Sequence, residues 1–194
     1  MNLGALPACS PRAFEQRYRE HADPWEFATS EYEQQRYAVT LRNLRRARYR
    51  NAFEPGCSIG LLTSALAERC ESVLATEVSV TALARARARC APFPNVRFEI
   101  RDLRAPPPRG PFDLIVFSEV GYYFDRRQLA DIASRLAGGL EPGGEIVAVH
   151  WLGNSEDHVL HGDEVHAVLR SELPLRPARC GRYRGFRLDS WIRA

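Results

Sequence analysis

The sequence predicts an α/β fold with a doubly wound, mostly parallel sheet of seven strands and a helical cap at its N-terminus. Three observations support this prediction. From about residue 50 onward, short apolar runs alternate with helical patterns, which is typical of a parallel sheet with helices on both faces. A glycine turn within residues 51–62 joins the first apolar run to the first of these helices. The chain then ends in two strand patterns without a helix between them.

The size and composition fit one domain. A chain of 194 residues can bury a sizeable core, so we assign residues 1–194 to a single unit, with a cap over residues 10–48 and a core over residues 49–194. The sequence has no apolar run of bilayer length and no N-terminal signal pattern, so we expect a cytoplasmic protein without a membrane partner. The five cysteines form no C-x-x-C pair, which argues against a disulfide framework or a zinc site.

The basic residues are all arginine, 27 in number, and the net charge is +3. Residues 42–50, RNLRRARYR, form a local basic run that could bind phosphates. No aromatic stacking platform or nucleic-acid motif accompanies this run, so we interpret it as the solvated face of a helix and expect no nucleic-acid partner. An RNA-binding module that uses these arginines is the alternative, and it predicts salt-sensitive binding.

Two helices are predicted before the glycine turn. Ser10 is a good N-cap and Pro11 suits the first helical position, so the first helix begins there. Ser30 and Glu33 have the spacing of a capping box, which predicts the start of the second helix. The link between the two helices, HADPWEFAT over residues 21–29, shows no regular pattern. We expect this link to close over the functional site.

The core elements follow along the rest of the chain. The predicted strands are NAF, SVLAT, VRFEI, FDLIVF, EIVAVHW, ARCGRYR and FRLDSWIRA. The predicted helices span residues 59–69, 80–90, 126–136 and 163–172. The stretch RAPPPRGP is predicted as a rigid loop before the fourth strand. In the last strand apolar and polar residues alternate, which predicts that one face is buried and the other is exposed.

The glycine turn carries a carboxylate at its entrance. A dinucleotide-binding turn reads G-x-G-x-x-G, whereas this one reads E-x-G-x-S-x-G from Glu54 to Gly60. Ligands of doubly wound sheets bind beyond the carboxyl ends of the strands, where this turn lies. A carboxylate there repels a diphosphate and attracts a cation, so Glu54 and Ser58 disfavour an NAD-dependent oxidoreductase. S-adenosylmethionine has an ammonium and a sulfonium but no phosphate, and it suits this turn better.

Two further acids follow neighbouring strand ends. Glu77 ends the second strand, where a carboxylate can accept hydrogen bonds from both ribose hydroxyls. Asp102 follows the third strand and is placed to accept a hydrogen bond from an adenine amino group, with the Leu103 backbone beside it. Acids at three successive strand ends favour a shared ligand over three unrelated, solvated loop residues.

Several motifs together resemble the class I S-adenosylmethionine-dependent methyltransferases, and most closely the nodulation N-methyltransferase (NodS-like) family. They are DPWEF, YEQQR, EPGCSIG, SEVGYYF, LEPGGEIV and HGDEVHAVL, and the similarity covers nearly the whole chain from Phe14. The resemblance implies a Rossmann-like class I methyltransferase fold with S-adenosyl-L-methionine as methyl donor. Ser58 departs from the general pattern, which usually has glycine at the middle of the turn, but its small side chain still lets a ligand approach.

The resemblance also implies which residues hold the donor. Glu54 and Gly56 would bind its methionine part. Trp25 and Arg36 would belong to the cap, with the Arg36 guanidinium available for the donor carboxylate. The other implied donor-binding positions are Cys57, Ser58, Gly60, Glu77, Val78, Asp102, Leu103 and Ser118.

The reacting centre is expected after the fourth strand. Methyl transfer is an in-line displacement at carbon, so the protein has to align donor and acceptor and keep the nucleophile unprotonated. Glu119 follows that strand and is the first candidate to anchor an acceptor amine or to take its proton. Tyr122 and Tyr123 would wall the pocket, and His150 at the end of the fifth strand is the rival base.

We expect an enzyme that methylates an amine on a glycan or a related small molecule, because the resemblance implies a deacetylated chitooligosaccharide as acceptor. O-methylation of a small metabolite is the alternative. Gly121 is small and is expected to widen the acceptor space. Three histidines follow the fifth strand, and no cysteine or carboxylate lies near them at the spacing of zinc-finger ligands. We therefore expect them to form a substrate-contacting loop and no metal site. They are His158, His161 and His166.

Overall fold

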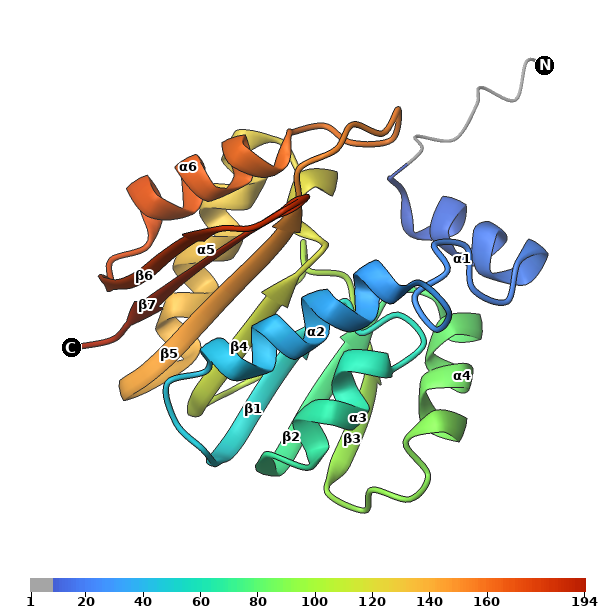
Figure 1. Ribbon diagram of the computed structural model, residues 1–194, viewed down its shortest axis with the longest axis horizontal. Helices are drawn as coiled ribbons and strands as arrows, with labels where there is room; N and C mark the ends of the chain where they lie inside the picture. The colour runs from blue at the N-terminus through green and yellow to red at the C-terminus, as the bar shows by residue number, and fades with distance from the viewer. Residues whose placement is uncertain (1–8) are drawn as a thin grey trace.

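The computed structural model describes residues 9–194, and its helices and strands alternate along the core (Figure 1). The helices are α1 (Pro11–Glu20), α2 (Glu31–Asn43), α3 (Leu61–Ala67), α4 (Val80–Arg89), α5 (Arg126–Gly139) and α6 (Gly162–Glu172), with a 3-10 turn η1 (Gly121–Tyr123). The strands are β1 (Tyr49–Pro55), β2 (Cys70–Glu77), β3 (Val96–Ile100), β4 (Phe112–Ser118), β5 (Leu140–Trp151), β6 (Arg176–Arg182) and β7 (Phe186–Ile192). Residues 1–8, where the predicted single unit begins, lie outside the described residues.

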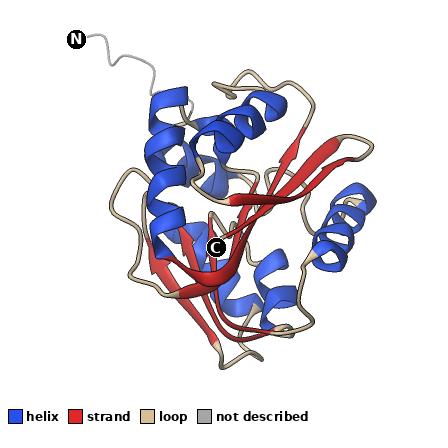
Figure 2. Cartoon of the chain, turned by 90° about the vertical axis from the view of Figure 1, so that its left-hand side faces the viewer, coloured by secondary structure: helices blue, strands red, loops and turns tan. Residues whose placement is uncertain are grey.

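The strands form one 7-stranded sheet in the order β3-β2-β1-β4-β5-β7-β6. Strands β1 to β5 run parallel to one another, whereas β7 is antiparallel to both β5 and β6. Helices cover both faces of the sheet (Figure 2). The predicted doubly wound, mostly parallel sheet is therefore confirmed.

Two apolar cores hold the helices against the sheet. On one face, α5 and α6 pack together and bury residues such as Leu129, Ile132 and Val165. On the other face, α2 and α3 lie over the sheet, with Leu62 and Leu66 buried against it. Burial of each such side chain stabilises the folded state by about 1.5–3 kcal/mol. The sheet is thus a packed platform for the loops at its ends.

The strand order brings the carboxyl ends of β1, β2 and β4 together. The chain runs from β1 outward to β2 and β3, and then returns to place β4 on the other side of β1. The order of strands reverses between β1 and β4, which is where doubly wound sheets bind their ligands. The segments that follow β1, β2 and β4 therefore meet at one edge.

The first core helix is shorter than predicted. The sequence predicts a helix over residues 59–69, but α3 begins at Leu61 and ends at Ala67. Gly60 precedes the helix in a left-handed conformation, with φ 82°. The turn therefore continues through Gly60 before the helix begins.

The predicted capping box at the start of α2 is wrong. The Ser30 side chain makes no capping hydrogen bond. The Glu33 carboxylate instead forms an ion pair with Arg36, one turn further along the helix. The start of the helix is nevertheless close to the prediction, because α2 begins at Glu31.

The half-exposed pattern predicted for the last strand is also wrong. Asp189 and Trp191 are 3% and 2% exposed, although they alternate with apolar residues on the opposite face. The reason is that α6 packs on one face of β7, while Phe186 and Leu188 on the other face lie in the core that also contacts Tyr32 of α2, so both faces are covered. Within residues 9–194, none of the helices has the length and apolar character that crossing a membrane requires.

Candidate active site

A cavity of about 450 Å³ lies beyond the carboxyl ends of the parallel strands. Residues of α1 and of the 21–29 link line one side of it, and the segment after β5 lines another. The predicted site residues that line this cavity are Trp25, Gly56, Ser58, Glu77, Val78, Asp102, Leu103, Glu119 and Tyr122. A second cavity of about 30 Å³ adjoins it and is lined by the predicted residues Arg36, Glu54, Cys57 and Ser118. Gly60 and His150 line neither cavity.

The glycine turn has three residues with positive φ: Gly56 at 75°, Ser58 at 51° and Gly60 at 82°. A Cβ atom at Gly56 would lie 2.2 Å from Cγ1 of Val120, so this position requires glycine. Ser58 has a cost of about 1–2 kcal/mol in the left-handed region. Its hydroxyl forms a 2.5 Å hydrogen bond with the Tyr18 hydroxyl, which ties the turn to α1. Serine at this position therefore makes a contact with the cap that glycine could not make.

Glu77 shapes the turn from the end of β2. Its Oε1 accepts hydrogen bonds from the amides of Val78 at 2.8 Å and Ser79 at 3.1 Å, and its Oε2 accepts one from the Ser58 amide at 3.0 Å. Each carboxylate oxygen has two lone-pair positions, so Oε2 keeps one for a ligand hydroxyl. Burial raises the pKa of Glu77, and the backbone hydrogen bonds oppose that shift. The prediction that it accepts from both ribose hydroxyls requires one of these bonds to give way.

Asp102 and Leu103 line the cavity after β3, as the sequence predicts. The Asp102 carboxylate accepts a 2.9 Å hydrogen bond from the Arg104 amide and forms an ion pair with the Arg104 guanidinium at 3.3 Å. Leu103 is buried, with 8% of its surface exposed. This part of the wall offers an acceptor beside an apolar surface, which suits a heterocycle that carries an amino group.

Glu54 is buried at the end of β1 and faces the small cavity. Its Oε2 has no hydrogen-bond partner among residues 9–194. Burial raises the pKa of Glu54 to about 8; the neighbouring Thr63 hydroxyl opposes the shift, and the negative charge of Glu77 adds to it. Because an unpartnered buried acceptor costs about 1–3 kcal/mol, Glu54 is set up to receive a donor group from a ligand.

Arg36 of α2 faces the same small cavity and is 1% exposed. Its Nη2 pairs with Glu33, and its Nη1 lies 2.5 Å from Oε2 of Glu119. Burial alone would lower the pKa of Arg36, but the two carboxylates outweigh it and the pKa is raised. Its Nε is buried without a partner among residues 9–194. The two Nη atoms of the guanidinium thus have carboxylate partners, whereas its Nε has none among residues 9–194.

Glu119 lies directly after β4 in a left-handed conformation, with φ 58°. Its Oε1 accepts a 2.8 Å hydrogen bond from the Trp151 amide, and its Oε2 accepts a 2.7 Å hydrogen bond from the Tyr122 hydroxyl. The Arg36 guanidinium neutralises its charge. A carboxylate held in this way is well placed to fix the geometry of the site, because both of its oxygens already have partners in the protein.

Aromatic side chains from the cap and from η1 enclose the cavity. Trp25 packs edge-on against Tyr18, with ring centroids 5.4 Å apart, and stacks on Phe27 at 5.8 Å. Tyr122 is 4% exposed, and Tyr123 packs against Phe14 of α1 at 4.8 Å. Tyr122 and Tyr123 thus line the cavity together with aromatic residues of the cap, and their role in binding stays a prediction.

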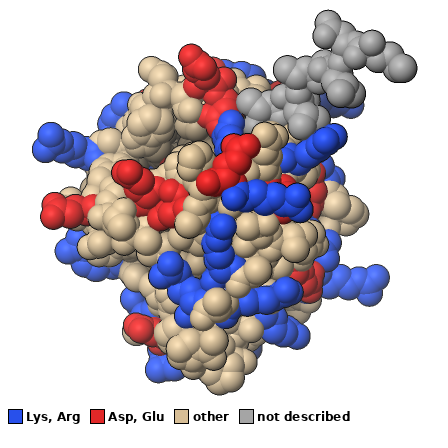
Figure 3. All heavy atoms as spheres, turned by 90° about the vertical axis from the view of Figure 1, so that its right-hand side faces the viewer, with Lys and Arg blue, Asp and Glu red and all other residues tan. Residues whose placement is uncertain are grey.

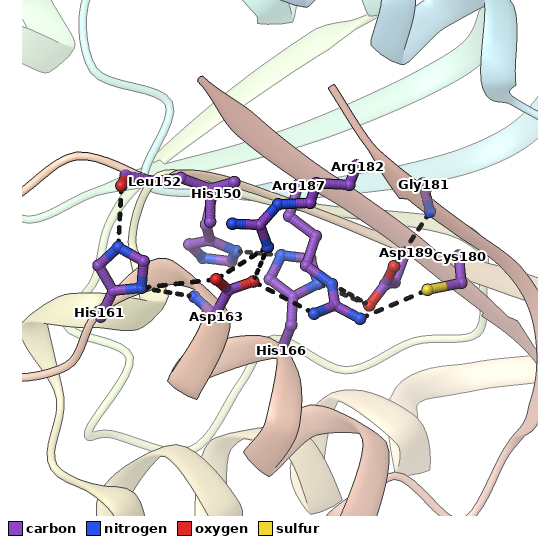
Figure 4. Close-up of polar contacts among 10 residues, drawn as sticks. All are labelled: His150, Leu152, His161, Asp163, His166, Cys180, Gly181, Arg182, Arg187 and Asp189. Carbon is purple, nitrogen blue, oxygen red and sulfur yellow. Dashed lines mark hydrogen bonds and ion pairs between the residues drawn. The ribbon is translucent and has the colours of Figure 1, made fainter. Parts of the chain in front are cut away.

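His150 is buried on the far side of η1, away from the cavity. Its Nε2 accepts a 3.0 Å hydrogen bond from the Gly121 amide, and its Nδ1 lies 3.2 Å from Nε2 of His166. The chain continues from Nδ1 of His166 to Asp189, at 2.9 Å (Figure 4). Burial lowers the pKa of His150 well below its ordinary value. The structure thus gives the predicted rival base a place in a buried polar chain that supports η1.

Gly121 does not widen the cavity, so that prediction is wrong. It is buried and faces away from the cavity, and a Cβ atom there would lie 2.5 Å from Val165 Cγ1 and 2.7 Å from His150 Nε2. The close approach of η1 to α6 and β5 is what requires glycine at this position.

Sequence reasoning missed the residues that fasten the cap. Glu15 of α1 accepts hydrogen bonds from the hydroxyls of Ser79 and Thr81, both at 2.7 Å, at the start of α4. Arg17 of α1 forms a 2.5 Å ion pair with Asp157 in the segment after β5. These contacts join elements far apart in the sequence, and no local pattern announces them.

The three histidines after β5 do not share a site. His161 precedes α6 and caps it by accepting a hydrogen bond from the Asp163 amide. His166 is buried in the chain with His150. His158 lines the cavity, so the predicted substrate-contacting role stays a prediction for this residue alone.

The basic run lies at the opposite end of the sheet, before and within the start of β1. Arg45 donates a 2.7 Å hydrogen bond to the Gly143 carbonyl, and Arg50 forms a 2.6 Å ion pair with Glu141. On the face that carries α1 and α4, arginine and acidic side chains are interspersed (Figure 3). Arginines of the basic run thus have partners within the protein.

The strand order, the acid-bearing glycine turn and the acids at the end of β2 and after β3 together define a protein of the class I methyltransferase type. The family model described as nodulation protein S (NodS) matches residues 12–150. The chain belongs to this family.

Individual relatives agree with the family assignment. The nodulation protein S of Sinorhizobium fredii is 31% identical over 156 residues, which cover 78% of this chain and 72% of the relative. That of Bradyrhizobium diazoefficiens is 39% identical over 102 residues, and the matched part spans about half of the relative, 49%. The crystal structure of the N-methyltransferase NodS from Bradyrhizobium japonicum in complex with S-adenosyl-L-homocysteine has a TM-score of 0.83 at 24% identity, with 94% of this chain and 98% of that chain covered. That likeness shows the fold.

Proposed function

We propose that this protein is an S-adenosylmethionine-dependent methyltransferase that N-methylates an amine on a glycan, chitooligosaccharide-like, or on a related small molecule. One observation carries the proposal. Glu54 Oε2 and Arg36 Nε are both buried without partners among residues 9–194, and both residues line the same small cavity beside the large one. The ammonium and carboxylate of an amino acid match this pair of groups. NAD has no such end, and its diphosphate cannot form with Glu54 the ion pair that an ammonium forms.

The large cavity would take the nucleoside end of the donor. The free position on Glu77 Oε2 would accept from a ribose hydroxyl, and Asp102 would accept from the adenine amino group. The small cavity, at about 30 Å³, has room for little more than a polar group, which fits the amino-acid end. The residues present therefore fit the donor.

When bound, the donor supplies an electrophilic methyl group on a sulfonium. This chain supplies alignment and exclusion of water, because α1, the link and η1 surround the cavity with aromatic side chains such as Phe14, Trp25 and Tyr123. Holding two reactants in line can lower the barrier by about 7–11 kcal/mol.

The acidic groups around the cavity favour a cationic acceptor. Glu33 and Glu119 share the single positive charge of Arg36. Burial raises the pKa of Glu33 to about 7, so the three groups together become negative as the pH rises through about 7. Both carboxylates line the cavity. An ammonium is therefore attracted to this wall by its charge, an attraction that a neutral hydroxyl lacks. This difference supports N-methylation over O-methylation.

The proposal is tested with donor labelled at its methyl group. Glucosamine oligomers with free amines, their fully acetylated counterparts and a set of phenols should be offered as acceptors, and the products analysed by mass spectrometry. We expect label only on acceptors with a free amine. Label on the phenols or on acetylated sugars would instead assign O-methylation.

A further inference from the structure

Two buried histidines connect η1 to the last strand of the sheet. His150 of β5 and His166 of α6 are both 0% exposed, and their ring centroids lie 5.2 Å apart (Figure 4). The Gly121 amide donates to His150 Nε2 at 3.0 Å, and His150 Nδ1 lies 3.2 Å from His166 Nε2. His166 Nδ1 lies 2.9 Å from Oδ2 of Asp189, which is 3% exposed. The side chains of His150, His166 and Asp189 are called the histidine network below.

The charges around the histidine network keep both rings neutral. Burial lowers the pKa of His150 well below its ordinary value, and it also lowers that of His166, where Asp189 opposes the shift. Burial alone would raise the pKa of Asp189, but His166 and Arg187 outweigh it and the pKa is lowered. Arg187 Nε donates to Asp189 Oδ2 at 2.9 Å, and the Gly181 amide donates to Oδ1 at 3.3 Å (Figure 4). The carboxylate is therefore ionised and held in one orientation.

The two ends of the histidine network determine where its protons lie. The Gly121 amide can only donate, so His150 Nε2 is bare and the one proton of this neutral ring lies on Nδ1. An ionised carboxylate can only accept, so His166 carries its proton on Nδ1 and its Nε2 is bare. These assignments come from opposite ends and agree where the rings meet, because His150 Nδ1–H then donates to His166 Nε2. Both rings thus adopt the Nδ1–H form, which is the minor form of free histidine.

At its other end the histidine network holds η1 beside the cavity. The residue after Gly121 is Tyr122, whose hydroxyl donates to Glu119 Oε2 at 2.7 Å. The Tyr122 ring also stands edge-on to the His150 ring, with centroids 5.5 Å apart. Glu119 lines the cavity and forms the ion pair with Arg36. The position of η1 therefore decides one of the hydrogen bonds that orient the Glu119 carboxylate.

We propose that the three side chains of the histidine network are positioning residues for methyl transfer, because they hold η1 so that Tyr122 keeps the Glu119 carboxylate in place. The role rests on the proposed N-methylation, in which this carboxylate attracts the acceptor ammonium. None of the three side chains lines either cavity, so they act through the Gly121 amide and the Tyr122 hydroxyl.

The direction of the hydrogen bonds is what apolar packing could not supply. His166 Nε2 is the acceptor that keeps the His150 proton on Nδ1. Without this acceptor the His150 proton can move to Nε2, where it would face the Gly121 N–H at 3.0 Å. Two donors at this distance repel each other, and a buried donor without an acceptor is costly. Loss of His166 should therefore displace η1.

The first test reads the protons directly and needs no variant, donor or acceptor. In full-length protein labelled with ¹⁵N, the ring nitrogen shifts, correlated with the assigned backbone, report which nitrogen carries the proton. We expect both His150 and His166 to be neutral at pH 7, with the proton on Nδ1 and Nε2 bare. The exposed His21 is the control and should show the averaged shifts of a ring that exchanges between its forms. A proton on Nε2 of either network histidine overturns the proposal.

The second test compares two substitutions of His166. His166→Leu removes the acceptor, whereas the amide of His166→Gln has an oxygen that can accept from His150 and an N–H that can donate to Asp189. Turnover of glucosamine oligomers should fall by about 100-fold in His166→Leu, and His166→Gln should regain at least about tenfold of it. Both variants should bind S-adenosylhomocysteine within about twofold of the parent protein, because neither change touches the cavities.

Ser190→Ala is the matched control for this comparison. Ser190 follows Asp189 on β7, is 3% exposed and points to the opposite face of the sheet, so this variant should keep the turnover of the parent protein. A His166→Leu enzyme within about twofold of the parent, or equal turnover in the two His166 variants, contradicts the positioning role. Parent protein that transfers no methyl group to any amine contradicts the proposed function itself.

Hydrogen exchange shows whether the loss acts through η1. The Gly121 amide should exchange at least about tenfold faster in His166→Leu than in the parent protein, because its acceptor is disturbed. The amide of Val116, which is 0% exposed in β4, should stay within about twofold. Equal acceleration at both amides would show a general loss of stability and would overturn the positioning role.

Discussion

Arg36 and Glu119 form a buried ion pair, with Nη1 2.5 Å from Oε2, that joins the cap helix α2 to the end of β4. Glu33 holds the same guanidinium from one turn away on α2. The cap is thus fastened to the sheet through a residue that also lines the cavity. Loss of this pair should therefore affect stability and function together.

Glu119→Gln should lower the free energy of unfolding by about 3 kcal/mol, because it leaves the buried guanidinium with one carboxylate in place of two. Glu141→Gln is the matched control, since its partner Arg50 is 67% exposed, and it should leave the urea midpoint almost unchanged. Urea titrations of the two variants at one pH decide the matter. Equal midpoints for both variants would show that the buried pair adds nothing.

Binding of the donor or its demethylated product should release a proton from Glu54. The carboxyl has a pKa of about 8 in the ligand-free protein, so it is mostly protonated at neutral pH. An ammonium at Oε2 favours the ionised form, so binding drives off the proton and affinity rises with pH while the free carboxyl is protonated, that is below about pH 8. Calorimetry in two buffers with different heats of ionisation measures the proton count. Glu54→Gln should abolish the buffer dependence, and a parent protein that shows none would contradict the role given to Glu54.

Glu77→Ala should weaken binding of S-adenosylhomocysteine by about 1.5–3 kcal/mol, the usual cost of a lost hydrogen bond to a charged group. Glu77 faces the cavity, whereas Glu99 on β3 is 45% exposed and pairs with Arg101. Glu99→Ala is therefore the control and should bind normally. Unchanged affinity in a folded Glu77→Ala variant would show that the ribose does not bind to Glu77.

The fold was predictable because each element leaves a local pattern. The sheet and its helices follow from the alternation of apolar runs, and the chemistry at the turn follows from Glu54 in the place where a dinucleotide site has glycine. Both depend on residues close together in the sequence. The structure confirms the sheet and places Glu54 at the end of β1.

The details of the site depended on contacts that no local pattern encodes. His150 lies near the end of β5, where the sequence predicts a site residue. Its side chain, however, points to the face of the sheet that packs on α6, and it meets His166 there. Tyr18 reaches Ser58 from another helix, and His158 meets Tyr122 across two connecting segments. Such pairs become visible only when the chain is folded, so the sequence identified residues that line the cavities, such as Glu77 and Asp102, but not the contacts that hold them in place.

Gly121→Ala should destabilise the protein by about 1–3 kcal/mol, because the added methyl group would meet Val165 and His150 at under 3 Å. Gly138 in α5 has nothing within 4 Å of an added Cβ, so Gly138→Ala is the control and should be neutral or stabilising. Thermal unfolding compares the two. A stable Gly121→Ala variant that accepts bulkier amines less well would restore the view that Gly121 borders the acceptor space.

The central claim is that the paired cavities hold a nucleoside joined to an amino acid. Calorimetric titration of the full chain with S-adenosylhomocysteine and, separately, with NAD tests it most directly. We predict saturable binding of one S-adenosylhomocysteine per chain and no heat of binding from NAD at concentrations up to about 1 mM, a limit that corresponds to about −4.1 kcal/mol. Comparable binding of NAD, or no binding of S-adenosylhomocysteine in that range, would contradict the claim.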